Sequence, residues 1–284
     1  MNLKMLIGAS ILAMAMSLGQ LSSLNKGGHP ILFETPETHA IAALLTVYQP
    51  YDVNGSVQLR RIGRANDGGY LIPELAMQKT DVVIGYGIAN DISFEDSATA
   101  IYGKPSYGFD CTCPAIQPRQ KECHFIPSCI ASKESSNPIP GYASFDQHLG
   151  MVGAAGKKLF IKMDIEGSEY DTMPDILRHA SAITGIVLEI HFMESGQIAQ
   201  ALRLLQMLDQ DFLLVHVHGN NNCKDNFISA NSRGNIPRVL ELTYINRNLV
   251  QYFEISPDQS HPTRLDMPNS PGIPDAEFAI LLDN

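Results

Sequence analysis

The chain has 284 residues, of which 44% are hydrophobic and 18% charged, a composition typical of a soluble globular protein and not of a disordered one. This length can hold one large α/β domain or two small ones. Twenty basic and thirty acidic side chains give a formal charge of -10, which repels phosphate backbones and anionic lipid headgroups at long range. We therefore expect no nucleic-acid partner.

The first 25 residues have the pattern of a targeting segment. No charged residue occurs between Lys4 and Lys26, and residues 5–19 are an apolar run of small and aliphatic residues, typical of a signal peptide. Pairs of small residues allow cleavage near residues 16–20. An uncleaved membrane anchor through residues 5–25, with the domain left in the cytoplasm, and a buried N-terminal helix are the alternatives. Residues 26–284 form the expected functional domain, with its core at about 60–250.

The spacing of the cysteines also indicates whether the chain is exported to an oxidising compartment, where disulfides form. Four of the five cysteines, Cys111, Cys113, Cys123 and Cys129, crowd into one segment, and Cys223 lies far away. In an exported chain this predicts one or two local disulfides, with at least one cysteine left over. Zinc is the competing interpretation, although the segment lacks the paired CxxC spacing of common structural sites.

From Asp81 onward, short apolar runs alternate with helical stretches, which predicts an α/β fold with a parallel sheet covered on both faces. We count about seven strands, and the last two follow the final long helix closely enough to form an antiparallel hairpin. A helix is expected from Thr35, and a crossover helix over residues 197–209 with Ser195 as its cap. Residues 141–156 and 220–237 are expected to be loops.

A glycine turn follows the first of these strands. Gly85 and Gly87 precede a helix, so backbone amides and the positive end of the helix could face a ligand. Asp110 ends the next strand, where a carboxylate could accept both hydroxyls of a ribose, which suits an adenosine-containing cofactor. Asn90 stands where a dinucleotide fingerprint has its third glycine, which argues against NAD. A simple tight turn is the structural alternative.

Acidic residues follow a second apolar strand. Asp164, Glu166 and Glu169 come where this strand ends and a helix begins. Ligands of open parallel sheets bind beyond the carboxyl ends of the strands, so these carboxylates are expected to face a crevice. The alternatives are a satisfied core carboxylate at Asp164 and a helix-dipole role for Glu169.

Two further strands end in histidine. Period-two alternation places Glu189 and His191 on one face of their strand, and it does the same for His216 and His218, which precede Asn220. Taking these strands as neighbours, we expect a site that supplies a general base or metal ligands. A purely structural hydrogen-bond network is an equally good interpretation.

Four segments in order resemble the FkbM-type branch of S-adenosylmethionine-dependent methyltransferases and the methyltransferase-like proteins related to it. They are residues 67–70 (DGGY), 85–87 with 91–95 (GYG and DISFE), 162–169 (KMDIEGSE) and 189–191 (EIH), and the likeness covers about residues 60–246. Val83 and Ala89 depart from the family pattern. The resemblance implies a Rossmann-like class I methyltransferase fold, with a seven-stranded, mostly parallel sheet whose last strand is antiparallel and with helices on both faces.

The resemblance also implies residue roles. Gly85 and Gly87 would line the methionine moiety of S-adenosylmethionine, Asp110 would hold its ribose, and Asp164 and Glu166 would border the site of methyl transfer. The matching segments add Asp67, Tyr86 and Glu95 to the predicted cofactor-binding set.

We expect the acceptor to be a hydroxyl of a small molecule or glycan, whose high pKa calls for a base, His191 or His218, or for a bound divalent metal. Asp164, His191, His218 and Asn220 together would suit Mn, Fe or Zn better than Mg.

Export conflicts with a cofactor made in the cytosol. One resolution is a compartment of the secretory pathway that imports the cofactor, and another is an anchored domain that stays in the cytoplasm. A different class of function is an exported, disulfide-linked binding module without catalysis. An NAD-dependent oxidoreductase is a third hypothesis. The binding module predicts that no cofactor binds, whereas the oxidoreductase predicts that a dinucleotide binds.

Overall fold

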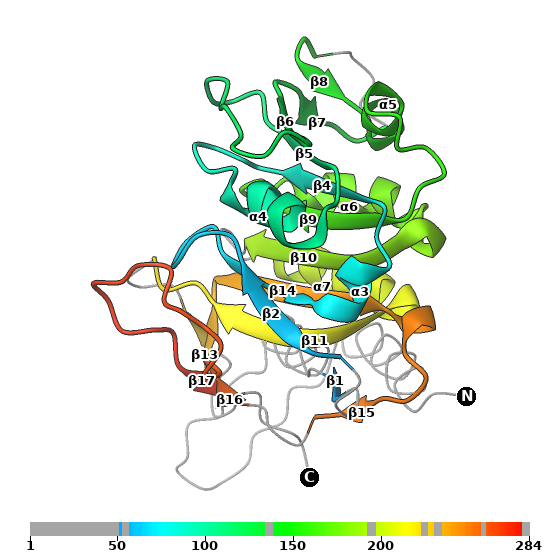
Figure 1. Cartoon of the computed structure of the whole chain (residues 1–284). Helices are drawn as coiled ribbons and strands as arrows, with labels where there is room; N and C mark the ends of the chain where they lie inside the picture. The colour runs from blue at the N-terminus through cyan, green and yellow to red at the C-terminus, as the bar shows by residue number, and fades with distance from the viewer. Residues whose placement is uncertain are drawn as a thin grey trace, which may run out of the picture.

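The computed structural model describes residues 51–52, 57–133, 139–191, 197–222, 227–229, 235–256 and 260–279. The targeting segment, the helix expected from Thr35, the cap Ser195 and Cys223 lie outside these residues. Within them, no helix combines the length and the apolar content needed to cross a bilayer. The chain folds around one large sheet, with smaller strand pairs at its margins (Figure 1).

The large sheet has seven strands in the order β11-β14-β10-β9-β4-β5-β6. Their bounds are β4 (Val82–Tyr86), β5 (Ser106–Phe109), β6 (Cys123–Ile126), β9 (Leu159–Met163), β10 (Ile183–His191), β11 (Phe212–Gly219) and β14 (Val239–Asn246). Neighbouring strands are parallel except at β14, which is antiparallel to both β10 and β11. The predicted mostly parallel, Rossmann-like sheet with an antiparallel last strand is confirmed. The sequence did not indicate that this last strand lies between β10 and β11.

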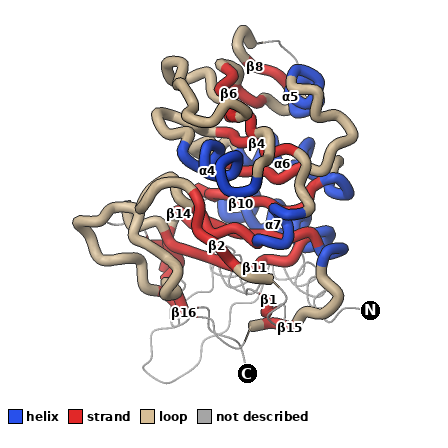
Figure 2. The backbone as a smooth tube through the Cα atoms, in the orientation of Figure 1, coloured by secondary structure: helices blue, strands red, loops and turns tan. Residues whose placement is uncertain are grey.

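Helices cover both faces of the sheet (Figure 2). One face packs against α5 (Phe145–Met151), α6 (Glu169–Leu177) and α7 (Gln197–Asp211), and the other against α3 (Glu74–Gln78) and α4 (Ser93–Tyr102). The hairpin of β2 (Leu59–Ile62) and β3 (Tyr70–Pro73) also lies on the α3 and α4 face. Strands buried on both faces explain the near-continuous apolar runs of the sequence.

Side-chain alternation assigns each core residue to a face. Ile84 and Ile161 belong to the cluster under α6 and α7, whereas their neighbours Val83 and Phe160 belong to the cluster under α3 and α4. The crossover helix α7 is confirmed and ends at Asp211, two residues later than expected. Its buried positions are Ile198, Ala201, Leu204, Leu205 and Leu208, so one apolar stripe faces the sheet.

Short strand pairs complete the fold. They are β1 (Tyr51–Asp52) with β15 (Glu254–Ile255), β7 (Cys129–Ile130) with β8 (Tyr142–Ala143), β12 (Phe227–Ser229) with β13 (Asn235–Pro237), and β16 (Ser260–His261) with β17 (Phe278–Ala279). Single 3₁₀ turns lie at Ala180–Ala182 and Arg247–Leu249. The expectation of a plain loop over residues 141–156 was wrong, because β8 and α5 fall there. The expected loop over residues 220–237 likewise carries β12 and β13.

The start of α5 carries a sequence signal that explains this helix. Ser144 accepts a hydrogen bond from the Gln147 amide, and the Gln147 side chain accepts one from the Ser144 amide. This reciprocal capping box satisfies two amides of the first helical turn.

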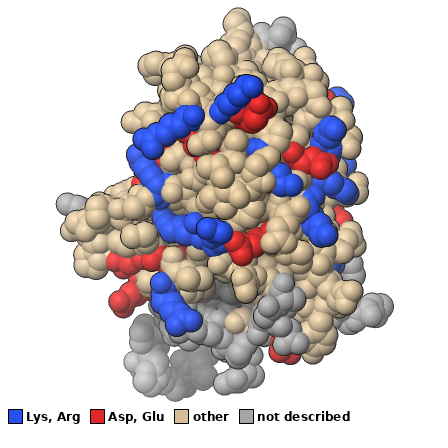
Figure 3. All heavy atoms as spheres, viewed as in Figure 1, with Lys and Arg blue, Asp and Glu red and all other residues tan. Residues whose placement is uncertain are grey.

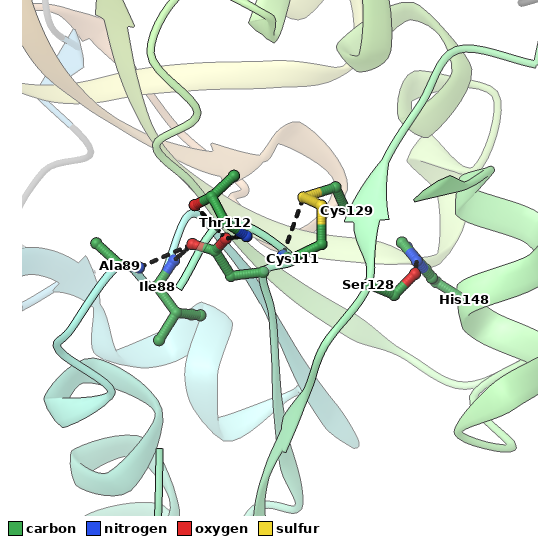
Figure 4. Close-up of a disulfide and its surroundings, with 8 residues drawn as sticks. Ile88, Ala89, Cys111, Thr112, Ser128, Cys129 and His148 are labelled. Atoms are coloured by element: carbon green, nitrogen blue, oxygen red, sulfur yellow. Dashed lines mark hydrogen bonds between the residues drawn. A yellow bond between two sulfur atoms is a disulfide. The ribbon is translucent and has the colours of Figure 1, made fainter. Parts of the chain in front are cut away.

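Among the described cysteines, Cys111 and Cys129 form a disulfide (Figure 4). Cys113 and Cys123 are free thiols. The bond ties the loop after β5 to β7. One of the one or two predicted local disulfides is therefore confirmed. Such a bond is typical of proteins that mature in an oxidising compartment.

Candidate functional site

The glycine turn lies where the strand order reverses. From β4 the sheet continues through β5 on one side and through β9 on the other, and ligands of open α/β sheets bind at such a switch point. Gly87 has φ +74°, and a Cβ there would lie 1.4 Å from the carbonyl oxygen of Asp164. A Cβ at Gly85 would lie 1.8 Å from a carboxylate oxygen of Glu95. In this structure the two glycines thus make room for protein atoms at the switch point.

Protein carboxylates bind the amides of this turn. Asp110 Oδ2 accepts hydrogen bonds from the amides of Ile88 (2.9 Å) and Ala89 (2.8 Å), and its Oδ1 accepts two from Thr112 (2.7 Å each; Figure 4). Asp91 Oδ1 accepts the amide of Ser93 at the start of α4 (3.0 Å). Asp110 therefore shapes the turn here, and ribose hydroxyls would have to compete with these donors. Its contact with a ribose stays a prediction.

Tyr86 directs its side chain into the core. Its ring is fully buried beside Phe109, and its hydroxyl lies 3.2 Å from His148 Nδ1. The other imidazole nitrogen of His148 lies 2.9 Å from the Ser128 hydroxyl (Figure 4). Only the carbonyl of Tyr86 faces the turn, where it accepts from Lys162 Nζ at 3.2 Å. The structure thus gives the side chain of this predicted cofactor residue a core position.

Asp67 lies on the turn between β2 and β3, against the start of α4. Its carboxylate is 3.9 Å from the guanidinium of Arg64, whose backbone amide donates to Ser93 Oγ at 2.8 Å. Arg64 Nε also pairs with Asp91 at 3.1 Å. The DGGY segment is thereby joined to the loop that follows the glycine turn.

Glu95 is buried in α4 behind Gly85, and neither of its carboxylate oxygens has a hydrogen-bond partner among the described residues. Burial raises its pKa from 4.5 to about 7, against the opposing charge of Lys162. The Glu95 carboxyl is therefore a buried group that lines the turn next to Gly85 and changes its protonation near neutral pH.

This burial predicts a pH-dependent difference between the wild type and Glu95→Gln. The carboxyl ionises near pH 4.5 in the unfolded chain but near pH 7 in the folded one, so its contribution to stability falls as the pH rises through this window. We expect the wild type to lose about 3 kcal/mol relative to the variant across it. Urea unfolding at pH 4.5, 6 and 8 measures the difference. Exposed Glu122→Gln is the matched control and should show no such change. A difference that does not vary with pH for Glu95→Gln would contradict the raised pKa of Glu95.

His191 stands at the end of β10 among carboxylates. Its Nδ1 lies 2.8 Å from Glu169 Oε1, and its Nε2 lies 3.4 Å from Glu189 Oε1, 3.5 Å from Glu166 Oε2 and 4.0 Å from Asp164 Oδ1. Burial alone would lower the pKa of His191, but the hydrogen bonds and charges of Glu169 and Glu189 outweigh burial and raise it to about 11. The predicted partners Asp164, Glu166 and His191 do come together.

Two residues outside the predicted site set hold this cluster in place. The Tyr70 hydroxyl donates to Asp164 Oδ2 at 3.1 Å and lies 3.4 Å from Glu189 Oε2. Lys162 Nζ donates to the Gly87 carbonyl at 2.6 Å and lies 3.8 Å from Asp164 Oδ2. The sequence signal for Lys162 is a lysine inside an otherwise apolar strand. Tyr70 is the last residue of the DGGY segment, which brings the β2–β3 hairpin over the cluster.

Asn220, which directly follows β11, also contacts the cluster. Its side-chain amide nitrogen donates to Glu189 Oε1 at 3.2 Å, and its side-chain oxygen accepts a hydrogen bond from the backbone amide of Asn222 at 2.9 Å. Asn220 thus positions Glu189 and does not itself contact Asp164 or His191.

His218 belongs to a separate network. Its ring nitrogens lie 3.1 Å from Glu241 on β14 and 3.1 Å from Asp275 in the C-terminal segment. The expectation that the two histidine strands are neighbours was wrong, because β14 lies between β10 and β11. Strands two positions apart are separated by about 10 Å, so His218 and His191 do not form one site. This geometry favours a structural role for His218.

No protein-family model matches the chain, and no curated protein matches it. Among solved structures, the chain is similar to a protein from Shewanella sp. PV-4 assigned to riboflavin biosynthesis, at 12% identity and a TM-score of 0.22, over 61% of this chain and 77% of that one. A likeness this slight bears on neither fold nor function. The functional conclusion therefore rests on the site itself.

Proposed function

We propose that the chain is an S-adenosylmethionine-dependent methyltransferase that acts on a hydroxyl group of a small molecule or glycan. The observation that supports this most is the carboxylate lining of the glycine turn at the switch point. Asp110 and Asp91 bind the amides that would otherwise hold a phosphate, and Lys162 is paired with Asp164 and two carbonyls. These surroundings suit a cationic cofactor better than the pyrophosphate of NAD.

When bound, S-adenosylmethionine would supply an electrophilic methyl group. The protein then has to align an acceptor and accept its proton. Asp164 and Glu166 follow β9 directly, and the Asp164 carbonyl abuts Gly87, so the carboxylates border the turn. Glu166 is 83% exposed and has φ +56°, a strained conformation that holds its carboxylate beside His191 and open to an acceptor.

Charge recognition gives a test that uses two nearly identical ligands. S-adenosylmethionine carries a sulfonium, whereas S-adenosylhomocysteine has a neutral thioether at the same position. We expect Asp164→Asn to weaken binding of the first ligand about tenfold more than binding of the second, because one nearby negative charge is removed. Calorimetric titration of the whole chain with each ligand measures this ratio.

Asp211→Asn, an exposed position at the end of α7, is the matched control and should leave both affinities unchanged. Equal weakening of both ligands by Asp164→Asn would contradict the role of charge in cofactor recognition. Absence of binding to the wild type would overturn the proposed function.

A further inference from the structure

Three donor groups from two neighbouring segments of the chain converge beside the glycine turn. Asp164 and Glu166 follow β9, and His191 ends the adjacent strand β10 (Figure 1). One ligand atom of each lies within 4.8 Å of those of the other two, and His191 Nε2 is 3.5 Å from Glu166 Oε2. A cation held by imidazole and carboxylates lies about 2.0–2.2 Å from each donor, so donors around a shared ion are about 3–4 Å apart. Small side-chain shifts would bring these three atoms to that spacing.

The imidazole is already oriented as a metal ligand. Its Nδ1 is bound to Glu169 at 2.8 Å, which leaves Nε2 directed at Asp164 and Glu166. Metal-binding histidines commonly have their second nitrogen bound to a carboxylate in this way, which fixes the ring and its tautomer. Glu169 is fully buried, and its other oxygen has no hydrogen-bond partner among the described residues.

The local charge also favours a cation. Asp164, Glu166, Glu169 and Glu189 surround His191, and Lys162 contacts only Asp164 among them. The four acidic side chains outnumber the two basic ones, His191 and Lys162, so the formal charge of the cluster is negative. A divalent ion would balance it.

We propose that Asp164, Glu166 and His191 bind a divalent first-row transition-metal ion. One imidazole and two carboxylates suit Mn²⁺, Fe²⁺ or Zn²⁺ better than Mg²⁺ or Ca²⁺, which prefer oxygen alone. The ligand set differs from the one expected from sequence, since His218 and Asn220 are bound elsewhere. The inference goes beyond the proposed function and stands without it, because ion binding needs no cofactor.

Titration of the whole chain with Mn²⁺ alone tests the site, with the electron paramagnetic resonance signal of free Mn²⁺ as the readout. We expect one equivalent to bind, with Zn²⁺ displacing it and an equal concentration of Mg²⁺ failing to do so. Glu166→Gln should weaken Mn²⁺ binding at least tenfold, and because this side chain is exposed, the variant should keep its fold. His191→Gln should abolish binding.

Exposed Glu122→Gln is the matched control and should bind Mn²⁺ like the wild type. Failure of the wild type to bind, or equal binding by Glu166→Gln and the wild type, would overturn the metal site. Binding of Mn²⁺ by a chain that does not bind S-adenosylmethionine would leave this site standing and remove the proposed function.

Discussion

Replacing His218 with glutamine is expected to lower the free energy of unfolding by about 3–5 kcal/mol. His218 is 1% exposed and bridges Glu241 on β14 to Asp275 in the C-terminal segment. The variant leaves both carboxylates without their cation, and Glu241 is itself buried. Nearby, His216 lies 2.8 Å from Asp266. Two histidines of β11 therefore bind the C-terminal segment to the sheet. Urea unfolding followed by circular dichroism measures the loss.

The same variant has a predictable pH dependence. Burial alone would lower the pKa of His218, but Asp275 and Glu241 outweigh burial and raise it from 6.5 to about 10. The stabilisation is therefore complete below pH 6.5 and is lost as the pH rises toward 10. The cost of His218→Gln should shrink over this window. Exposed His124→Gln is the control and should cost less than about 0.5 kcal/mol; an equally small cost for His218→Gln would refute the structural role.

Gly87→Ala is expected to cost about 4 kcal/mol or to prevent folding. The added Cβ would lie 1.4 Å from the carbonyl oxygen of Asp164, and backbone atoms at this junction cannot move away as a flexible side chain would. The positive φ of Gly87 adds the strain of a left-handed conformation. Thermal and urea unfolding of the variant measure the combined effect.

Gly103→Ala separates these two causes. Gly103 has φ +66° at the end of α4, but a Cβ there would meet nothing within 4 Å. This control should cost only about 1 kcal/mol, the price of the backbone conformation. If Gly87→Ala costs no more than Gly103→Ala, the close approach of the glycine turn to Asp164 is wrong.

Apolar patterning was sufficient to predict the sheet, because most of its strands are buried on both faces and read as short apolar runs. It failed at α5, where Gly150, Gly153 and Gly156 at and just beyond the end of the helix make residues 145–151 look like a loop. The Ser144 to Gln147 capping spacing was the signal that could have identified this helix.

The proximity of Asp164, Glu166 and His191 could be predicted from the order of the strands along the chain. Asp164 and Glu166 leave one strand and His191 ends the adjacent parallel strand, so their meeting follows from the edge rule for parallel sheets. His218 was misplaced because adjacency in sequence does not reveal that a later strand, β14, inserts between β10 and β11. Asp266 and Asp275, the partners of His216 and His218, lie 50 and 57 residues farther along the chain. Their segment has no hydrophobic periodicity from which its packing against β11 could have been predicted.

We propose that the glycine turn receives a cationic adenosyl cofactor and not a dinucleotide. Calorimetric titration of the whole chain with S-adenosylmethionine and, separately, with NAD tests it most directly. We expect one site with micromolar affinity for S-adenosylmethionine, competition by S-adenosylhomocysteine and no binding of NAD. Binding of NAD alone would indicate an oxidoreductase, and binding of neither ligand would indicate an exported module without catalysis. Either result would contradict the proposed methyltransferase function.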